Sequence, residues 1–231
     1  MAPSTAPAAP SSPVHDLRGT SATRVLPYPP DSLLLVGGIP GAGKSTLLNR
    51  LFALQGTETG PVATPDGARV VDSQQVRNRL ARRLRALPSP FRRRVTHLVH
   101  YLAVLRALRT GDGPVVAHVT ATRRTALTLL GRYCRRRGFG VHLLLIDADP
   151  QAALHGQIAR GRALSPRSHR RHARRWLRVL ADCASGAHAV VPGARSAVLL
   201  DRTAAAALAE IRFTPAPRTP EGGGDVPGAM P

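Results

Sequence analysis

The sequence predicts an α/β protein built on a parallel β-sheet with helices on both of its faces. One reason is that short runs rich in valine and leucine alternate with longer segments whose apolar residues recur at helical spacing. Such alternation is typical of strand–helix–strand units, whose strands lie parallel and buried. The second reason is a glycine-rich loop between the first apolar run and the first helical segment. We expect five strands in the sheet, at residues 33–37, 69–72, 114–119, 141–147 and 197–201.

The first strand and the loop after it carry the clearest chemical signal. Leu33–Val36 is an apolar run bounded by glycine, and Gly38 to Ser45 matches the phosphate-binding loop pattern G-x-x-x-x-G-K-[ST]. The glycines let the backbone curl so that its N–H groups point at one anion, and the following helix adds its positive N-terminal end. The predicted ATP-binding residues are Gly38, Ile39, Pro40, Gly41, Ala42, Gly43, Lys44, Ser45 and Thr46.

Two residues of this loop have distinct predicted roles. Lys44 supplies a positive charge to the outer phosphates, and the hydroxyl of Ser45 can bind Mg²⁺. The chain contains 33 lysine and arginine residues, and Lys44 is the only lysine among them. Because the compact ammonium and the fork-shaped guanidinium bind phosphates differently, this single lysine supports the prediction of a phosphate-binding site.

The rest of the chain reads as further strand–helix units. The short second strand ends in Asp72, and the longest predicted helix spans Phe91–Arg109. Residues 1–30 and 214–231 are rich in proline and small residues and are expected to be disordered tails, which leaves residues 31–213 as the folded domain. Further helices are expected after Ser73 and at residues 123–137, 150–160, 173–183 and 203–211.

The composition restricts the partners and the location of the protein. The formal net charge of +20 favours an anionic partner such as a nucleotide, a nucleic acid or another phosphorylated substrate. The arginines are spread over every segment, so a merely basic composition is an equal alternative. Cys134 and Cys183 form no metal or redox spacing, and no apolar run is long enough to span a membrane. We therefore expect a cytoplasmic protein without membrane contact.

Polar side chains stand at the carboxyl ends of several predicted strands. Asp72, Thr120, Thr122 and Asp147 each follow an apolar run. Ligands of open parallel sheets bind at these ends of the strands. We therefore expect these side chains to converge on the phosphate-binding loop, although they lie far apart in the sequence.

A series of five short segments, in this order, carries a family resemblance. They are Gly38–Thr46, Val70–Ser73 with Arg77, Pro114–Thr122, Leu143–Asp147 and Arg160–Arg162. With them, residues 33–162 resemble P-loop kinases of small molecules and polynucleotides, including zeta-toxin-like kinases, and more closely AAA-family ATP-binding proteins of actinobacterial type.

This resemblance implies both a fold and a set of roles. The fold is the P-loop NTPase three-layer α/β/α sandwich, with the five strands in the order 2-3-1-4-5. A catalytic base and a substrate-binding arginine follow the second strand, and Arg77 matches that arginine. An arginine of a lid covers the phosphates, and Arg160 or Arg162 matches it.

Two positions depart from the kinase pattern. The base stands three residues before the arginine, and here that position is Gln74, which cannot accept a proton. The third strand of such kinases ends in an acid near Mg²⁺, whereas this chain has Ala117-His118-Val119-Thr120. Asp147 follows a similar apolar run, but its place in the strand order puts it beside the lid. We therefore assign Asp72 as the catalytic carboxylate and, with Ser45, as the Mg²⁺ ligand; its alternative role is a strand-end or helix-capping aspartate.

Three functions remain open from the sequence. The first is a kinase-like phosphotransferase or an ATP hydrolase with an unidentified acceptor, whose catalytic residues are Lys44, Asp72, Arg77, Arg160 and Arg162. The second is a sensor that binds ATP without turnover, which the glutamine and the acid-free third strand favour. The third is a nucleic-acid-binding protein, which the charge favours, although the aromatic residues available for base stacking make up only 3% of the chain.

Overall fold

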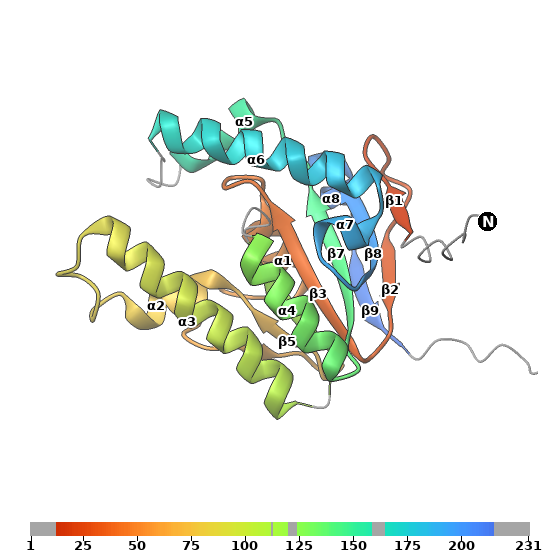
Figure 1. The fold of residues 1–231 in the computed structure, drawn as a ribbon, viewed down its shortest axis with the longest axis horizontal. Coiled ribbons are helices and arrows are strands. Elements are labelled where there is room, and N and C mark those ends of the chain that lie inside the picture. Colours follow the sequence, from red (N-terminus) through yellow and green to blue (C-terminus); the bar gives the residue numbers. More distant parts are fainter. Residues whose placement is uncertain (1–12, 112, 120–123, 159–164, 215–231) are drawn as a thin grey trace, which may run out of the picture.

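The computed structural model describes residues 13–111, 113–119, 124–158 and 165–214. Its centre is a seven-stranded sheet with the strand order β1-β8-β7-β3-β6-β5-β4 (Figure 1). Every neighbouring pair in this sheet is parallel except β4 with β5. The strands are β1 (Val14–Asp16), β3 (Ser32–Gly38), β4 (Val62–Ala63), β5 (Arg69–Val71), β6 (Val115–His118), β7 (Gly140–Ile146) and β8 (Ala194–Leu200).

The five predicted strands are present and are arranged as predicted. In chain order they are β3, β5, β6, β7 and β8, and in the sheet they lie in the sequence β5-β6-β3-β7-β8. This is the predicted order 2-3-1-4-5. All seven residues of β3 and all seven of β7 are buried, as expected for central strands that are covered on both faces. The predicted α/β class is therefore confirmed.

The predicted number of strands was too low. The sheet gains β1 at one edge and the antiparallel β4 at the other, and a second sheet pairs β2 (Val25–Tyr28) with β9 (Glu210–Phe213). These strands are short and, unlike the equally short β5 and β6, contain no two consecutive buried residues, so they show no apolar run. Backbone pairing with distant residues specifies them instead, as in the pair Val14 and Ala197.

These additional strands also correct two predictions near the chain ends. Residues 1–30 were expected to be disordered, yet β1 and β2 lie within them, and Leu26 and Tyr28 are buried in the core. The helix expected at 203–211 ends at Ala207, because the chain then extends to pair with β2. The tail predictions for residues 1–12 and 215–231 lie outside the described residues.

Helices cover the sheet and bring distant parts of the chain together. In the view of Figure 1, α3 and α4 lie in front of the sheet. On α1, Arg50 donates a hydrogen bond to the carbonyl of Ala205 in α8, so these two helices are neighbours. No helix among the described residues has the length and apolarity needed to cross a membrane. The helices are α1 (Lys44–Leu51), α2 (Ser73–Leu80), α3 (Ser89–Thr110), α4 (Arg124–Arg136), α5 (Pro150–Ile158), α6 (Pro166–Ala184), α7 (Ala187–Val190) and α8 (Arg202–Ala207).

Candidate nucleotide-binding site

The loop between β3 and α1 has a backbone that only glycine adopts easily. Gly41 and Gly43 have φ values of 89° and 101°, in the left-handed region that disfavours other residues. A side chain at Gly41 would also overlap the carbonyl oxygen of Ala153 in α5. Gly43 is the N-cap of α1 and has no side chain to occupy the helix end. The first N–H groups of α1 can therefore face an anion.

The side chain of Lys44 lies against the loop that precedes it. Its Nζ donates hydrogen bonds to the carbonyl oxygens of Gly38 at 2.9 Å and of Ile39 at 2.7 Å. Only 5% of the residue is exposed. The ammonium group is thus held at the loop backbone, the place where the sequence predicted a positive charge for phosphates.

Two residues that the sequence did not predict donate hydrogen bonds to backbone carbonyls of this loop. Gln157 of α5 donates from Nε2 to the carbonyl oxygen of Pro40 at 2.8 Å. Arg202 of α8 donates from Nη2 to the carbonyl oxygens of Gly41 at 3.2 Å and of Ala152 at 3.1 Å. The sequence carried no signal for Gln157. For Arg202, the only available signal was its position just after the carboxyl end of β8.

Asp72 is buried at the junction of β5 and α2. Its side chain caps α2 by accepting a hydrogen bond from the backbone N–H of Gln74 at 2.9 Å. The side chain of Gln75 accepts one from the backbone N–H of Asp72 at 3.0 Å, which completes a capping box. The side chain of Asp72 is 3% exposed. The alternative role from the sequence, a capping aspartate, is therefore present in the structure.

The same carboxylate also contacts the end of the neighbouring strand β6. Val71 is in register with Ala117, so Asp72 and His118 follow as neighbours. Oδ1 of Asp72 lies 2.8 Å from Nδ1 of His118. The hydroxyl Oγ of Ser45 lies 3.5 Å from the same ring nitrogen. A carboxylate, an imidazole and the predicted Mg²⁺-binding hydroxyl thus meet beside the loop.

The electrostatics of this group favour an ionised Asp72 and a neutral His118. Burial alone would raise the pKa of Asp72, but His118 and the N–H of Gln74 outweigh it and hold the pKa well below its usual range. Burial lowers the pKa of His118, opposed by Asp72 and assisted by the positive charges of Lys44 and Arg77. Because a carboxylate only accepts, Nδ1–H of His118 donates to it.

A second histidine supports the end of β6. Nε2 of His100 in α3 lies 2.6 Å from the carbonyl oxygen of His118 and therefore donates to it. His100 is 2% exposed, and burial lowers its pKa to about 4. This neutral histidine connects α3 to the carboxyl end of β6 through its hydrogen bond.

The predicted substrate arginine lies on the first turns of α2. Nε of Arg77 donates to Oε1 of Gln74 at 3.0 Å, and Nη1 donates to Oγ of Ser73 at 3.2 Å. Arg77 is near enough to His118 for its charge to lower the histidine pKa. The other predicted residues of the pocket mouth, namely Thr120, Thr122, Arg160 and Arg162, lie outside the described residues.

Asp147 at the end of β7 has its side chain engaged by Trp176 and Arg18. Its Oδ1 accepts a hydrogen bond from the indole N–H of Trp176 in α6 at 2.9 Å. Its Oδ2 pairs with the guanidinium of Arg18 at 2.8 Å. The structure therefore does not bring this second candidate acid together with Ser45, whereas it does bring Asp72 there through His118.

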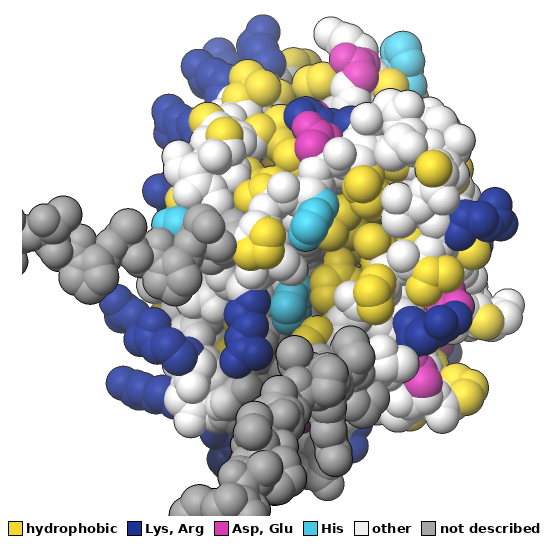
Figure 2. All heavy atoms as spheres, turned by 90° about the vertical axis from the view of Figure 1, so that its right-hand side faces the viewer, with side chains coloured by type: hydrophobic (Ala, Val, Ile, Leu, Met, Phe, Trp, Pro, Cys, Tyr) yellow, Lys and Arg dark blue, Asp and Glu magenta, His cyan; other side chains and the backbone are white. Residues whose placement is uncertain are grey.

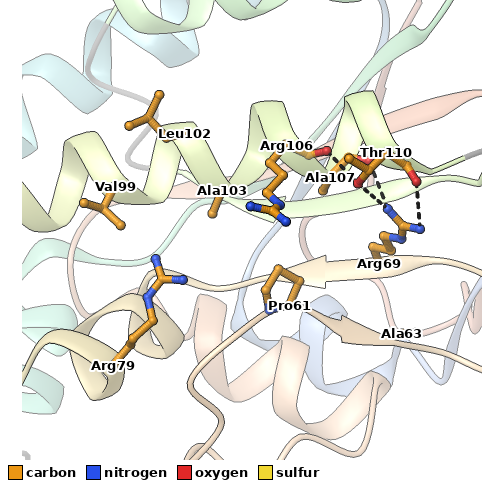
Figure 3. A pocket seen from close by; sticks show the side chains of 10 residues that line it. All are labelled: Pro61, Ala63, Arg69, Arg79, Val99, Leu102, Ala103, Arg106, Ala107 and Thr110. Atoms are coloured by element: carbon orange, nitrogen blue, oxygen red, sulfur yellow. Dashed lines mark hydrogen bonds between the residues drawn. The ribbon is translucent and has the colours of Figure 1, made fainter.

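A separate groove of about 690 Å³ runs along α3. It has an apolar wall and three arginines, and Arg69 is fixed in it by hydrogen bonds to Thr110 (Figure 3). None of its lining residues belongs to the phosphate-binding loop or to the Asp72–His118 pair. The lining residues are Pro61, Ala63, Arg69, Arg79, Val99, Leu102, Ala103, Arg106, Ala107 and Thr110.

The fold and the loop together define the class of the protein. A parallel sheet with a glycine-rich phosphate-binding loop between its central strand and the next helix is the framework of P-loop nucleotide-binding proteins. A comparison with protein families matches residues 33–182 to a family described as AAA domain. The match covers more than half of the chain, which therefore belongs to the AAA domain family. A comparison with curated proteins returned no match.

Several solved structures are similar to this chain at low identity. They include the tunicamycin resistance protein of Deinococcus radiodurans, with 16% identity over 62% of this chain and 80% of that chain and a TM-score of 0.41. The PezAT toxin–antitoxin system of Streptococcus pneumoniae matches with 15% identity over 62% of this chain and 55% of that chain, with a TM-score of 0.40. A kinase candidate of Chloroflexus aurantiacus matches with 16% identity over 74% and 85%, with a TM-score of 0.49. These similarities are too distant to transfer an activity.

Proposed function

We propose that the protein binds Mg·ATP at the β3–α1 loop and transfers or hydrolyses the γ-phosphate, with an acceptor that is not identified. The observation that carries this proposal is the meeting of Ser45, His118 and Asp72 beside the loop that holds Lys44. The loop provides N–H groups and one ammonium for phosphates. The neighbouring group provides an ionised carboxylate where the metal and the acceptor would lie.

The residues present fit the two cofactors. Loop glycines that leave no room for a side chain, as at Gly41, suit a backbone that closes around phosphate. Mg²⁺ prefers oxygen ligands and usually takes only one or two from the protein, the rest coming from water and phosphate. The hydroxyl of Ser45 and the carboxylate of Asp72 form such a set. Among the described residues there is no group of three or more His, Cys, Asp or Glu that would indicate a different metal.

Each residue then has a role in phosphoryl transfer. Lys44 and the loop N–H groups bind the outer phosphates and stabilise the charge that develops on them. When bound, Mg²⁺ would neutralise charge on the phosphate oxygens. Asp72 orients the acceptor or the metal, and Arg77 binds the acceptor. From the sequence alone, Arg160 or Arg162 is proposed as the arginine that contacts the phosphates.

The experiment compares wild type with Lys44→Ala for ATP binding and turnover, with and without Mg²⁺. The matched control is Arg132→Ala, which removes an exposed positive charge from α4. Turnover should fall by about 10²-fold or more in Lys44→Ala and should stay at the wild-type level in Arg132→Ala. Equal turnover in Lys44→Ala and wild type would refute the proposal.

A second candidate is an ATP sensor without turnover. It is favoured by Gln74, whose amide is used within α2: Nε2 donates to Asn78 at 2.7 Å and Oε1 accepts from Arg77. Such a protein would bind Mg·ATP tightly and leave it intact with every acceptor tested. Measurable turnover that depends on Lys44 would exclude it.

Nucleic-acid binding is a weaker candidate. Figure 2 shows one face of the molecule, on which the Lys and Arg side chains are scattered around the margin and separated by apolar surface. Binding of a phosphate backbone to several arginines would weaken steeply with salt. A flat salt dependence would count against this candidate.

A further inference from the structure

The last residue of β6, His118, belongs to the run Ala117-His118-Val119-Thr120, in which the sequence has no acid. His118 is in register with Val36 of β3, two residues before Gly38, where the phosphate-binding loop begins. A side chain at this position reaches the first turn of α1, as the distance of 3.5 Å between Nδ1 of His118 and Oγ of Ser45 indicates. An imidazole thus lies beside the hydroxyl that is predicted to bind Mg²⁺.

The carboxylate is found one strand further out. Asp72 follows β5, the direct neighbour of β6, and its Oδ1 lies 2.8 Å from Nδ1 of His118. Only 3% of the Asp72 side chain and 13% of the His118 side chain are exposed. The same Oδ1 accepts from the N–H of Gln74 and from the hydroxyl of Ser73. The acidic group is therefore held by donors from α2 and β6, and it also has a side-chain hydrogen bond with Ser45 of the loop.

We propose that His118 is the positioning residue of this site: its Nδ1–H holds Asp72 beside Ser45, so that Asp72 supplies from β5 the acid that β6 lacks. This inference rests on the proposed function, because it assigns the geometry of the metal-linked acid in that reaction. His118 itself touches neither substrate nor metal. The backbone carbonyl of His118 accepts a hydrogen bond from His100, which fixes the backbone that carries the His118 ring.

The protonation states agree with this role. Asp72 is ionised and can only accept, so Nδ1 of His118 carries the proton. A neutral donor next to a carboxylate is the usual arrangement that orients a metal ligand, and its loss typically weakens metal binding by about 10–100-fold.

The first experiment measures the affinity of Mn²⁺ in the presence of a non-hydrolysable ATP analogue, by electron paramagnetic resonance of the free ion. His118→Leu removes the donor, whereas His118→Asn keeps an N–H close to the place of Nδ1. We expect Mn²⁺ affinity to fall about tenfold or more in His118→Leu and to stay within about threefold of wild type in His118→Asn. Affinity for the nucleotide without metal should be unchanged in both, because the loop and Lys44 bind it.

The second experiment exchanges the positions of the acid. Asp72→Asn should lose Mn²⁺ affinity, and the double variant Asp72→Asn/His118→Asp should regain most of it, because the acid then lies on β6. Thermal unfolding checks that each variant is folded. If His118→Leu does not fold, His118→Asn and the exchange still decide the question.

The outcomes separate this inference from the proposed function. A wild-type protein that binds neither nucleotide nor Mn²⁺ contradicts the proposed function. A wild type that binds and turns over Mg·ATP, together with a His118→Leu variant of unchanged Mn²⁺ affinity, contradicts only the role of His118. Failure of a folded exchange variant to regain affinity contradicts it as well.

Discussion

Replacing Asp72 by alanine and by asparagine separates its structural role from its chemical role. Alanine removes the cap of α2, which contributes about 1 kcal/mol. It also leaves the buried Nδ1–H of His118 without its acceptor, which costs about 1–3 kcal/mol. The free energy of unfolding should therefore fall by about 2–4 kcal/mol. For a chain of this size that corresponds to a decrease of about 4–16 °C in Tm.

Asparagine keeps the shape and the accepting oxygen but not the charge. Asparagine caps helices as well as aspartate does, so Asp72→Asn should lose about 1 kcal/mol or less. Both variants should lose turnover, while both should bind ATP through the loop and Lys44. Urea denaturation gives the stability, and ATP binding and turnover assays give the function. A folded Asp72→Asn variant with wild-type turnover would refute the assignment of Asp72 as the catalytic carboxylate. Equal losses in the free energy of unfolding for the two variants would refute the capping argument.

Three further predictions test the loop, the second acid and the pH dependence. Gly41→Ala should abolish nucleotide binding, because the added Cβ overlaps a carbonyl oxygen of α5. The control Gly60→Ala should bind nucleotide normally, because its Cβ has open space. Equal nucleotide binding by both variants would show that the loop can move aside. Asp147→Asn should lower Tm by weakening its bond to Trp176 and leave turnover intact, and loss of turnover without loss of stability would instead mark it as the metal-linked acid. Because the pKa of His100 is lowered from 6.5 to about 4, the unfolded chain binds a proton that the folded chain does not, and stability should fall as the pH drops from about 6.5 toward 4. His100→Gln, which keeps an N–H donor without a titratable group, should show a smaller fall in chemical denaturation at pH 7 and pH 4.5, and an equal fall would contradict this reading of the pKa.

Local patterns in the sequence were sufficient for the central framework. The phosphate-binding loop depends on glycine, lysine and serine at fixed spacing, which is a property of neighbouring residues. The five predicted strands were recognisable from their apolar runs, and their order followed from a resemblance carried by five short segments. The edge strands β1 and β4 and the β2–β9 sheet were missed, because none of them contains a run of buried apolar residues.

Only the tertiary structure decided which polar groups meet. The sequence offered Asp72 and Asp147 as strand-end acids with no way to measure their distance from Ser45. The register of β5 on β6 brings Asp72 to His118, and the packing of α6 brings Trp176 to Asp147. Contacts of this kind depend on residues 29 to 46 positions apart, so no local spacing encodes them. The sequence by itself determined that a phosphate-binding loop is present, and the packing of strands and helices decided which carboxylate stands beside it.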